Sequence, residues 1–132
     1  MGLRIVSDDE NGVAVEAPVA LNSNHLRTAF GGSINAVATL AAYGLLWLEL
    51  RKPGVHVVVA ESSIRFLRPV RETIRAVCAR PGPDEWKAFR ADFESAGKAR
   101  LQLRVKVVEA EQTAAEFEGT FVARSHAPAS SR

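Results

Sequence analysis

The stretch "RTAFGGSINAVATLAAYGLLWLELRKPG", residues 27–54, contains the most hydrophobic helix-like run of the chain, and two adjacent glycines stand near its start. Apolar residues occupy nearly every face of this run, so a helix formed here must be covered on all sides. Its uninterrupted apolar part, residues 36–48 apart from Thr39, is shorter than the ~20 residues that cross a bilayer. We therefore expect a helix inside a protein core and no membrane partner.

The rest of the chain is rich in strand-like segments that can cover such a helix. The segment "VHVVVAESSIRFLRPV", residues 55–70, follows a Pro-Gly stop signal and is rich in β-branched residues. The segment "ARLQLRVKVVEA", residues 99–110, alternates between apolar and polar residues, as a half-buried strand does. In all, the sequence predicts strands over residues 3–7, 12–17, 55–70, 73–80, 99–110 and 114–124.

A short amphipathic helix is predicted among these strands, because aromatic residues recur at helical spacing between Asp84 and Gly97. The element order is thus two strands, a long helix, and four strands with a short helix inserted. One antiparallel sheet curled around the long helix would cover its apolar surface, whereas a flat sheet covers one side. We expect an α+β hotdog fold, with one domain over residues 1–124 and a disordered C-terminal tail over residues 125–132.

Composition and charge disfavour several classes of protein. The length of 132 residues suits one domain, and the net charge of +2 comes from Lys and Arg scattered among acids, unlike a nucleic-acid binder. The single cysteine, Cys78, is expected to be a buried thiol in a reducing compartment. The first ten residues hold acids where a signal peptide needs an apolar stretch, so we expect a cytoplasmic protein. No spacing of His, Cys and carboxylates resembles a metal site, and we expect no metal and no cofactor.

The glycine pair at the start of the long helix, Gly31 and Gly32, has two interpretations. The first turn of a helix leaves backbone N–H groups without intrahelical partners, and the helix dipole makes that end positive. Without side chains to shield them, these amides could hold the oxyanion that forms when water attacks a thioester carbonyl. Alternatively, two small residues simply let the helix start pass close to the sheet.

Three segments of the chain resemble a known family. The sequences "FGGSINAVATLAAYGLLWLELR", "AESSIRFLRPV" and "FEGTFVAR" are similar to the thioesterase-like hotdog family whose members occur alone or fused behind an acetyltransferase domain. The similarity runs from Pro18 to Arg124. It implies an acyl-thioester hydrolase that acts on an acyl-CoA or an acyl carrier protein and assembles as a homo-oligomer, either a dimer or a tetramer.

The resemblance also implies a site at the helix start. Related hotdog thioesterases carry His-Gly-Gly there, an asparagine a few residues earlier, and a helix carboxylate further on that activates water. Here Asn24 lies at a suitable distance to be the upstream asparagine, and Asn22 is the alternative. The motif reads Phe30-Gly31-Gly32, and Thr39 stands where the carboxylate is expected. The imidazole and the usual general base are therefore both missing.

Glu61 is the candidate replacement for that base. It lies inside an apolar strand, where a charge is costly unless it is paired or functional, and Ser62 and Ser63 beside it could order a water. In hotdog dimers the strand after the helix lies at the sheet edge and pairs with its copy, which would bring Glu61 near the partner's helix. The alternative is a structural ion pair with Arg65 or another arginine.

Further residues are expected to bind the substrate. On the apolar helix, Asn35, Thr39 and Tyr43 follow Gly31 at intervals of four residues and form one polar stripe. Their side chains need hydrogen-bond partners, which a substrate groove, sheet carbonyls or another subunit could supply. Arginines in "RFLRPVR", residues 65–71, would suit the phosphates of coenzyme A or an acidic carrier protein. The predicted catalytic residues are Asn24, Gly31, Gly32 and Glu61, and the predicted substrate-binding residues are Phe30, Ser33, Asn35, Thr39, Tyr43, Ser63, Arg65 and Arg68.

The sequence thus predicts a thioesterase that works without a metal or redox cofactor, with Tyr43, Leu46, Trp47 and Phe66 lining its acyl pocket. A non-catalytic acyl-thioester binding module remains the alternative, because it would use the same glycines and groove without a base. A hotdog dehydratase is disfavoured by the lack of a histidine and acid pair. Ser33 lacks the Gly-x-Ser-x-Gly elbow, which disfavours a serine-triad hydrolase.

Overall fold

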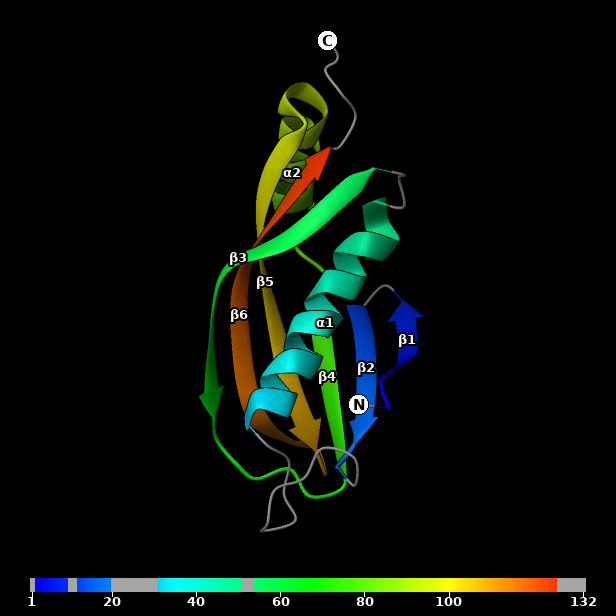
Figure 1. Cartoon of the computed structure of the whole chain (residues 1–132), viewed down its shortest axis with the longest axis vertical. Coiled ribbons are helices and arrows are strands. Elements are labelled where there is room, and N and C mark those ends of the chain that lie inside the picture. The colour runs from blue at the N-terminus through cyan, green and yellow to red at the C-terminus, as the bar shows by residue number, and fades with distance from the viewer. Residues whose placement is uncertain (1, 10–11, 20–30, 51–53, 126–132) are drawn as a thin grey trace.

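The computed structural model of the chain describes residues 2–9, 12–19, 31–50 and 54–125, which form six strands and two helices (Figure 1). The predicted order of elements is confirmed. The strands are β1 (Arg4–Asp9), β2 (Gly12–Pro18), β3 (Val55–Phe66), β4 (Thr73–Ala79), β5 (Lys98–Glu109) and β6 (Gln112–Ser125), and the helices are α1 (Gly31–Leu50) and α2 (Pro83–Ala96).

Most strand boundaries differ by one or two residues from the sequence expectation, and the end of β3 differs most. β3 ends at Phe66 rather than at Val70, because the N–H groups of Leu67 and Arg68 both turn onto the carbonyl oxygen of Ala114, at 2.7 and 3.0 Å. β6 continues through Ser125, one residue past the predicted end of the domain. The remainder of the predicted tail, residues 126–132, lies outside the described residues.

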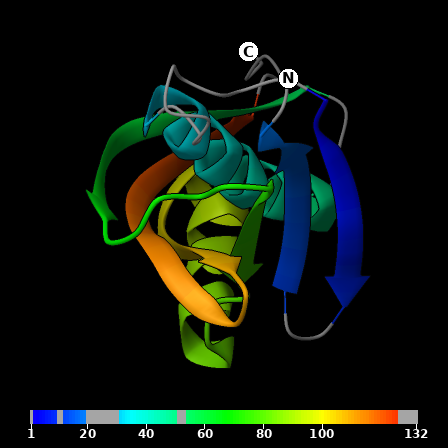
Figure 2. The same cartoon turned by 90° about the horizontal axis from the view of Figure 1, so that it is seen from below.

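The strands form one antiparallel sheet in the order β1-β2-β4-β5-β6-β3. The sheet curves around α1, as the view from below shows (Figure 2). This arrangement confirms the predicted hotdog fold. It also confirms that β3, the strand after the long helix, lies at an edge of the sheet.

The central helix α1 is a core element. It has 20 residues and is long and apolar enough to cross a membrane, in contrast to the expectation from its uninterrupted apolar part. However, it packs against five strands, β2 to β6, which is the environment of a core helix. Its buried residues are Ile34, Val37, Ala38, Ala41, Ala42, Leu45, Leu46 and Leu50.

The sheet does not cover α1 on every side. Leu40, Tyr43 and Trp47 are 38%, 39% and 56% exposed, although they belong to the helix that the sequence predicts to be covered all round. These three residues are spaced three to four apart and so share one face of the helix. The expectation of complete covering is therefore wrong within the described part of the chain, because the curved sheet encloses α1 from one side only.

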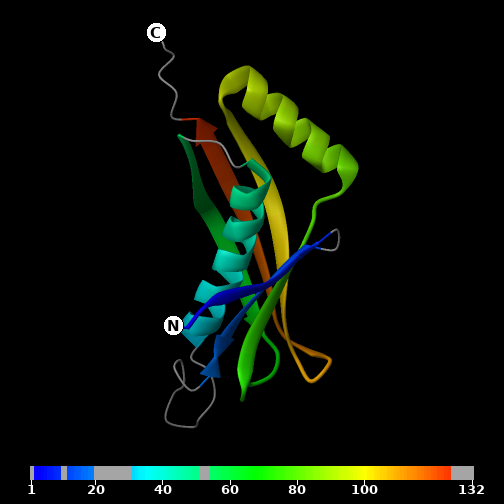
Figure 3. The ribbon, with the colours of Figure 1, turned by 90° about the vertical axis from the view of Figure 1, so that its right-hand side faces the viewer.

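The second helix closes the end of the molecule at which α1 finishes (Figure 3). Its aromatic residues stack in series, with ring centroids 5.3 Å apart for Trp86 and Phe89 and 6.3 Å apart for Phe89 and Phe93. Phe89 and Phe93 are buried in the same core as α1. Gly97 ends the helix in a left-handed conformation and donates its N–H to Phe93, as the sequence predicts for a C-terminal cap.

Candidate functional site

The start of α1 opens onto a hollow. The described part of α1 begins at Gly31, and the N–H groups of its first turn, residues 31–33, have no helical acceptor among the described residues. Both glycines are exposed. A hollow of about 350 Å³ lies beside this turn, and its lining residues are Gly31, Ile34, Phe66, Leu67, Arg68 and Pro69. The helix start therefore faces a space that a small group can enter.

Phe66, the last residue of β3, forms the wall of the hollow nearest to the glycines. A Cβ atom placed on Gly31 would lie 3.3 Å from Cζ of Phe66, whereas one placed on Gly32 would meet nothing within 4 Å. A contact of 3.3 Å is tight for carbon atoms, which prefer separations of roughly 3.5–4.0 Å. Gly31 thus has a packing reason to be glycine. A Cβ atom on Gly32 would contact none of the described residues, so packing among them does not explain the glycine at this position.

The polar stripe on α1 is partly satisfied within the helix. The hydroxyl of Thr39 donates to the carbonyl oxygen of Asn35 at 2.8 Å, a partner that the sequence reasoning did not consider. Asn35 and Thr39 are half-buried and Tyr43 is exposed. None of these three residues, nor the half-buried Ser33, is among the residues that line the hollow at Gly31.

The structure does not bring the predicted acyl-pocket residues together. Leu46 is fully buried in the core, whereas Trp47 is exposed. Trp47 lies roughly 24 Å along the helix from Gly31, at 1.5 Å per residue. Phe66 is beside Gly31, so it cannot share a pocket with Trp47 within one chain.

Glu61 points away from the hollow. The pairing of β3 with β6 shifts by one residue between Val59 and Glu61, which marks a β-bulge. Beyond the bulge, Ile64 and Phe66 pair with the inward-facing Phe117 and Ala115, so Glu61 lies on the opposite, outer face. Within one chain Glu61 and Gly31 are therefore on different faces of the sheet. Glu61 is also exposed rather than buried, contrary to the expectation from its apolar neighbours.

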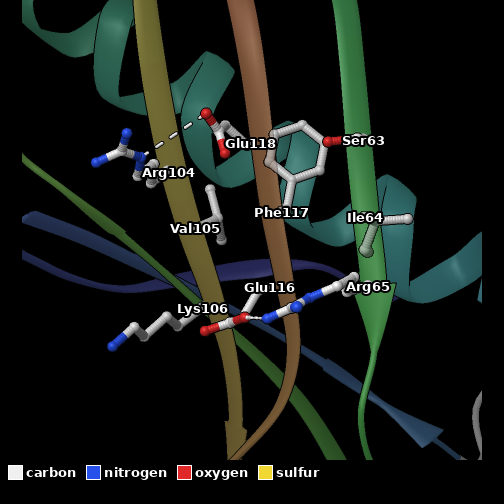
Figure 4. A pocket seen from close by; sticks show the side chains of 9 residues that line it. All are labelled: Ser63, Ile64, Arg65, Arg104, Val105, Lys106, Glu116, Phe117 and Glu118. Carbon is white, nitrogen blue, oxygen red and sulfur yellow. Dashed lines mark hydrogen bonds and ion pairs between the residues drawn. The ribbon is translucent and has the colours of Figure 1, made fainter.

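By the alternation of the strand, Ser63 and Arg65 share that outer face with Glu61. Figure 4 shows Ser63 and Arg65 on β3. Arg65 forms an ion pair with Glu116 of β6, not with Glu61, so the proposed Glu61–Arg65 pair is wrong. Ser63 and Arg65 line an outer hollow of about 310 Å³ together with charged residues of β5 and β6. α1 is behind the sheet in this view, so this hollow is separate from the one at Gly31.

Of the arginines predicted to bind phosphate, Arg68 lines the hollow at Gly31. Arg71 is three residues further along the connection between β3 and β4, and its backbone N–H donates to the carboxylate of Glu109. Sequence reasoning missed Glu109 because it resembles any polar residue before a hairpin turn. It also missed Leu67 and Pro69, because no local pattern indicates that the chain leaves the strand at this point to line a hollow.

Two acid–base groups have shifted pKa values. Partial burial opposes ionisation of Glu109, but hydrogen bonds from the N–H groups of Arg71, Glu72 and Thr73, together with the charge of Arg71, lower its pKa below the usual 4.5. Burial raises the pKa of Cys78 to about 12, despite the opposing charge of Arg80. Cys78 is buried, as predicted, and its thiol is not ionised at neutral pH.

Several predicted residues fall where the structure gives no placement. Asn24 and Phe30 lie outside the described residues. His56 is the second residue of β3. Among the residues that the structure describes, no group of three or more His, Cys, Asp or Glu could hold a metal ion.

A curled sheet around one helix, with the first turn of that helix beside an open hollow, defines a hotdog protein of the thioesterase type. The chain belongs to the family described as "Putative thioesterase (yiiD_Cterm)", whose model matches residues 1–125. At this coarse level, fold and family support an acyl-thioester hydrolase.

Solved structures with this fold are similar over most of the chain. A protein of unknown function from Chlorobaculum tepidum is 32% identical, with a TM-score of 0.87, and the match covers 95% of this chain and 83% of that one. A protein from Shewanella oneidensis described as a "putative thioesterase" is 27% identical, with a TM-score of 0.82 and coverage of 92% and 83%. A Bacillus halodurans protein solved with CoA is 22% identical, with a TM-score of 0.65 and coverage of 83% and 66%.

Proposed function

We propose that this protein hydrolyses acyl thioesters at the first turn of α1, and that acyl-CoA or an acyl carrier protein thioester is the substrate. The observation that carries the proposal is the hollow beside Gly31, which gives a carbonyl group room to approach the exposed start of the helix. The N–H groups of a first turn and the positive end of the helix dipole favour developing negative charge.

The proposed reaction needs no cofactor. The thioester carbonyl rests against the amides of Gly31 and Gly32, and water adds to the carbonyl carbon, forming a C–O bond and an oxyanion. Collapse of this intermediate breaks the C–S bond, releases the thiolate, which takes up the proton lost by the water, and leaves the carboxylic acid. Removing one oxyanion donor in such a site typically lowers kcat by about 10²–10³-fold.

The hollow also suits the carrier part of the substrate. Its one charged lining residue among those described is Arg68, and an exposed guanidinium can bind a phosphate group. The Bacillus halodurans protein with the same fold was solved with CoA, which supports acyl-CoA as the first substrate to test. Leu67 and Phe66, both half-exposed, provide apolar surface for the acyl or pantetheine chain.

The general base of the proposed reaction comes from outside the described residues that line the hollow. Glu61 and Gly31 lie on different faces within one chain, so Glu61 can serve only from a second subunit. Two features support a homodimer: β3 is an edge strand exposed along most of its length, and α1 exposes Leu40, Tyr43 and Trp47. In such a dimer the edge strands would pair, and Glu61 would lie at the junction of the two subunits.

The test is thiol release from a panel of acyl-CoAs and an acyl carrier protein thioester, with Glu61→Gln and Glu72→Gln compared with the wild type. Glu72 is an exposed acid between the strands and is the matched control. We expect turnover by the wild type and Glu72→Gln, and loss of kcat in Glu61→Gln. Unchanged turnover in Glu61→Gln would remove Glu61 from the mechanism.

A second function, a non-catalytic acyl-thioester binding module, is favoured by one observation. No carboxylate or imidazole is among the described residues that line the hollow. Thermal stabilisation by acyl-CoA without thiol release from any substrate in the panel would support this function and refute hydrolysis. Sedimentation in the analytical ultracentrifuge tests separately whether the protein is a dimer in solution.

A further inference from the structure

The connection between β3 and β4 forms much of the wall that faces Gly31. Leu67, Arg68 and Pro69 of this connection line the hollow, immediately after Phe66. The shape of the hollow therefore depends on what holds a segment that belongs to neither a helix nor a strand. Any catalytic role for the groups that hold this segment rests on the proposed use of the hollow as the thioester site.

The first half of the connection is held by β6 and by the core. The N–H groups of Leu67 and Arg68 both donate to the carbonyl oxygen of Ala114, and the side chain of Val70 is fully buried. These contacts fix the position of the chain just after β3. They leave Arg71, Glu72 and the first residue of β4, Thr73, to be held by other groups.

Residues 71–73 are held by β2 and by one carboxylate. The N–H of Val19 donates to the carbonyl oxygen of Glu72 at 2.9 Å, and Thr73 pairs with Pro18. Glu109 accepts hydrogen bonds from three amides. The N–H of Arg71 donates to Glu109 at 3.0 Å to Oε1 and 3.2 Å to Oε2. The N–H groups of Glu72 and Thr73 donate to Oε2 at 2.8 and 3.3 Å. Three consecutive amides thus converge on one ionised group, and charge-assisted hydrogen bonds of this kind are roughly twice as strong as neutral ones.

The position of Glu109 is fixed independently of the connection. It is the last residue of β5 and pairs with Gln112 across a two-residue turn. The turn residues Ala110 and Glu111 have φ values of 53° and 64°, the left-handed conformation that a tight hairpin requires. Glu109 therefore reaches from a rigid hairpin to a segment without regular structure.

We propose that Glu109 is a positioning residue for the thioester site: its carboxylate gathers the amides of residues 71–73 and so holds the wall formed by Leu67, Arg68 and Pro69 against the start of α1. Glu109 touches neither the substrate nor the glycines. Its loss would let the wall move, weakening substrate binding in the ground state and the transition state alike. Such a change raises KM more than it lowers kcat.

The experiment compares Glu109→Ala and Glu109→Gln with Glu111→Gln, a matched control at the exposed neighbouring acid. Hydrogen exchange of the Arg71, Glu72 and Thr73 amides is measured first. We expect faster exchange in Glu109→Ala, a smaller change in Glu109→Gln because the amide keeps one acceptor oxygen, and no change in Glu111→Gln. In acyl-CoA hydrolysis, Glu109→Ala should raise KM about tenfold with kcat changed less than about twofold, and Glu109→Gln should restore most of the loss.

The outcomes separate the two proposals. Unchanged amide exchange in Glu109→Ala, or faster exchange with an unchanged KM in an active enzyme, would overturn the role of Glu109 and leave the hydrolase intact. If the wild type hydrolyses nothing, the dissociation constant for a non-hydrolysable acyl-CoA analogue replaces KM. Weaker binding in Glu109→Ala then supports Glu109, whereas no binding by the wild type overturns both proposals. Circular dichroism and Tm establish that each variant is folded.

Discussion

The two ends of α1 are built differently. At its C-terminal end, Glu49 forms ion pairs with Arg80 and Arg90, and Arg80 also pairs with Asp8 near the β1–β2 turn. The aromatic residues of α2 fill the space beside this end. At its N-terminal end, the helix begins with two glycines beside a hollow of about 350 Å³ and an exposed Phe66.

The C-terminal end of α1, which we call the closed end, contributes to stability, whereas the N-terminal end, which we call the open end, leaves room for a ligand. The closed end buries large aromatic side chains, which stabilise the fold, and pairs the charges that are partly withdrawn from water beside them. The open end leaves first-turn amides beside free space, which contributes little to stability but is what ligand binding needs. Changes at the closed end should therefore alter stability, and changes at the open end should alter activity.

The largest expected effect is on the free energy of unfolding. It is tested by replacing one phenylalanine with alanine at each end of α1. Phe89→Ala should lower the free energy of unfolding by about 3–5 kcal/mol, because Phe89 is fully buried. Phe66→Ala should lower it by less than about 1 kcal/mol, because Phe66 is half-exposed. Urea unfolding measures both. Similar losses for the two variants would contradict the contrast between the ends.

The next effect concerns activity at the open end. Gly31→Ala should lower kcat/KM at least about tenfold, because the added methyl group meets Phe66 and shifts the wall or the helix start. Gly32→Ala keeps the N–H group and adds a methyl group that meets nothing within 4 Å, so it should lower kcat/KM less than Gly31→Ala does. Steady-state hydrolysis of acyl-CoA measures both. A larger loss in Gly32→Ala would show that access to the amides, not clearance of Phe66, limits the rate.

A smaller effect is expected from the ion pairs at the closed end. Arg80→Ala should destabilise the protein by about 1–2 kcal/mol, because Arg80 is mostly buried and bonds two carboxylates and the carbonyl oxygen of Asp9. Arg104→Ala should cost less than about 0.5 kcal/mol, because Arg104 is exposed and 3.9 Å from Glu118. Thermal unfolding of the two variants measures the difference. Equal costs would mean that the Arg80 network adds nothing beyond a surface pair.

The smallest effect is a dependence of stability on pH at the open end. The folded state lowers the pKa of Glu109, so its carboxylate stabilises the fold above the ordinary pKa of 4.5, and this stabilisation is lost as pH falls through the lowered value. The Tm difference between the wild type and Glu109→Gln should therefore be constant from pH 8 to about 6 and shrink below about 4.5. A difference that grows in acid would have the wrong sign for this explanation.

Sequence patterns predicted most of the fold because they report local periodicity. The alternation of residues 99–110 placed β5, and the spacing of the α2 aromatics between Asp84 and Gly97 placed that helix. The position of the glycine pair at the first turn of α1 was also predicted. The environment of Glu61 was not, because a single bulge reverses which face a strand residue occupies, and no local pattern marks it.

Two decisive contacts join segments that are far apart in the sequence. Phe66 meets Gly31, and Glu109 binds the amides of residues 71–73, only because the sheet brings their elements side by side. The sequence by itself determined which segments are helix or strand, that one helix needs a sheet around it, and which residue types stand at the helix start. Only the tertiary structure decided which face Glu61 takes, which stripe of α1 stays exposed and what walls the hollow, because these depend on long-range pairing rather than on local periodicity.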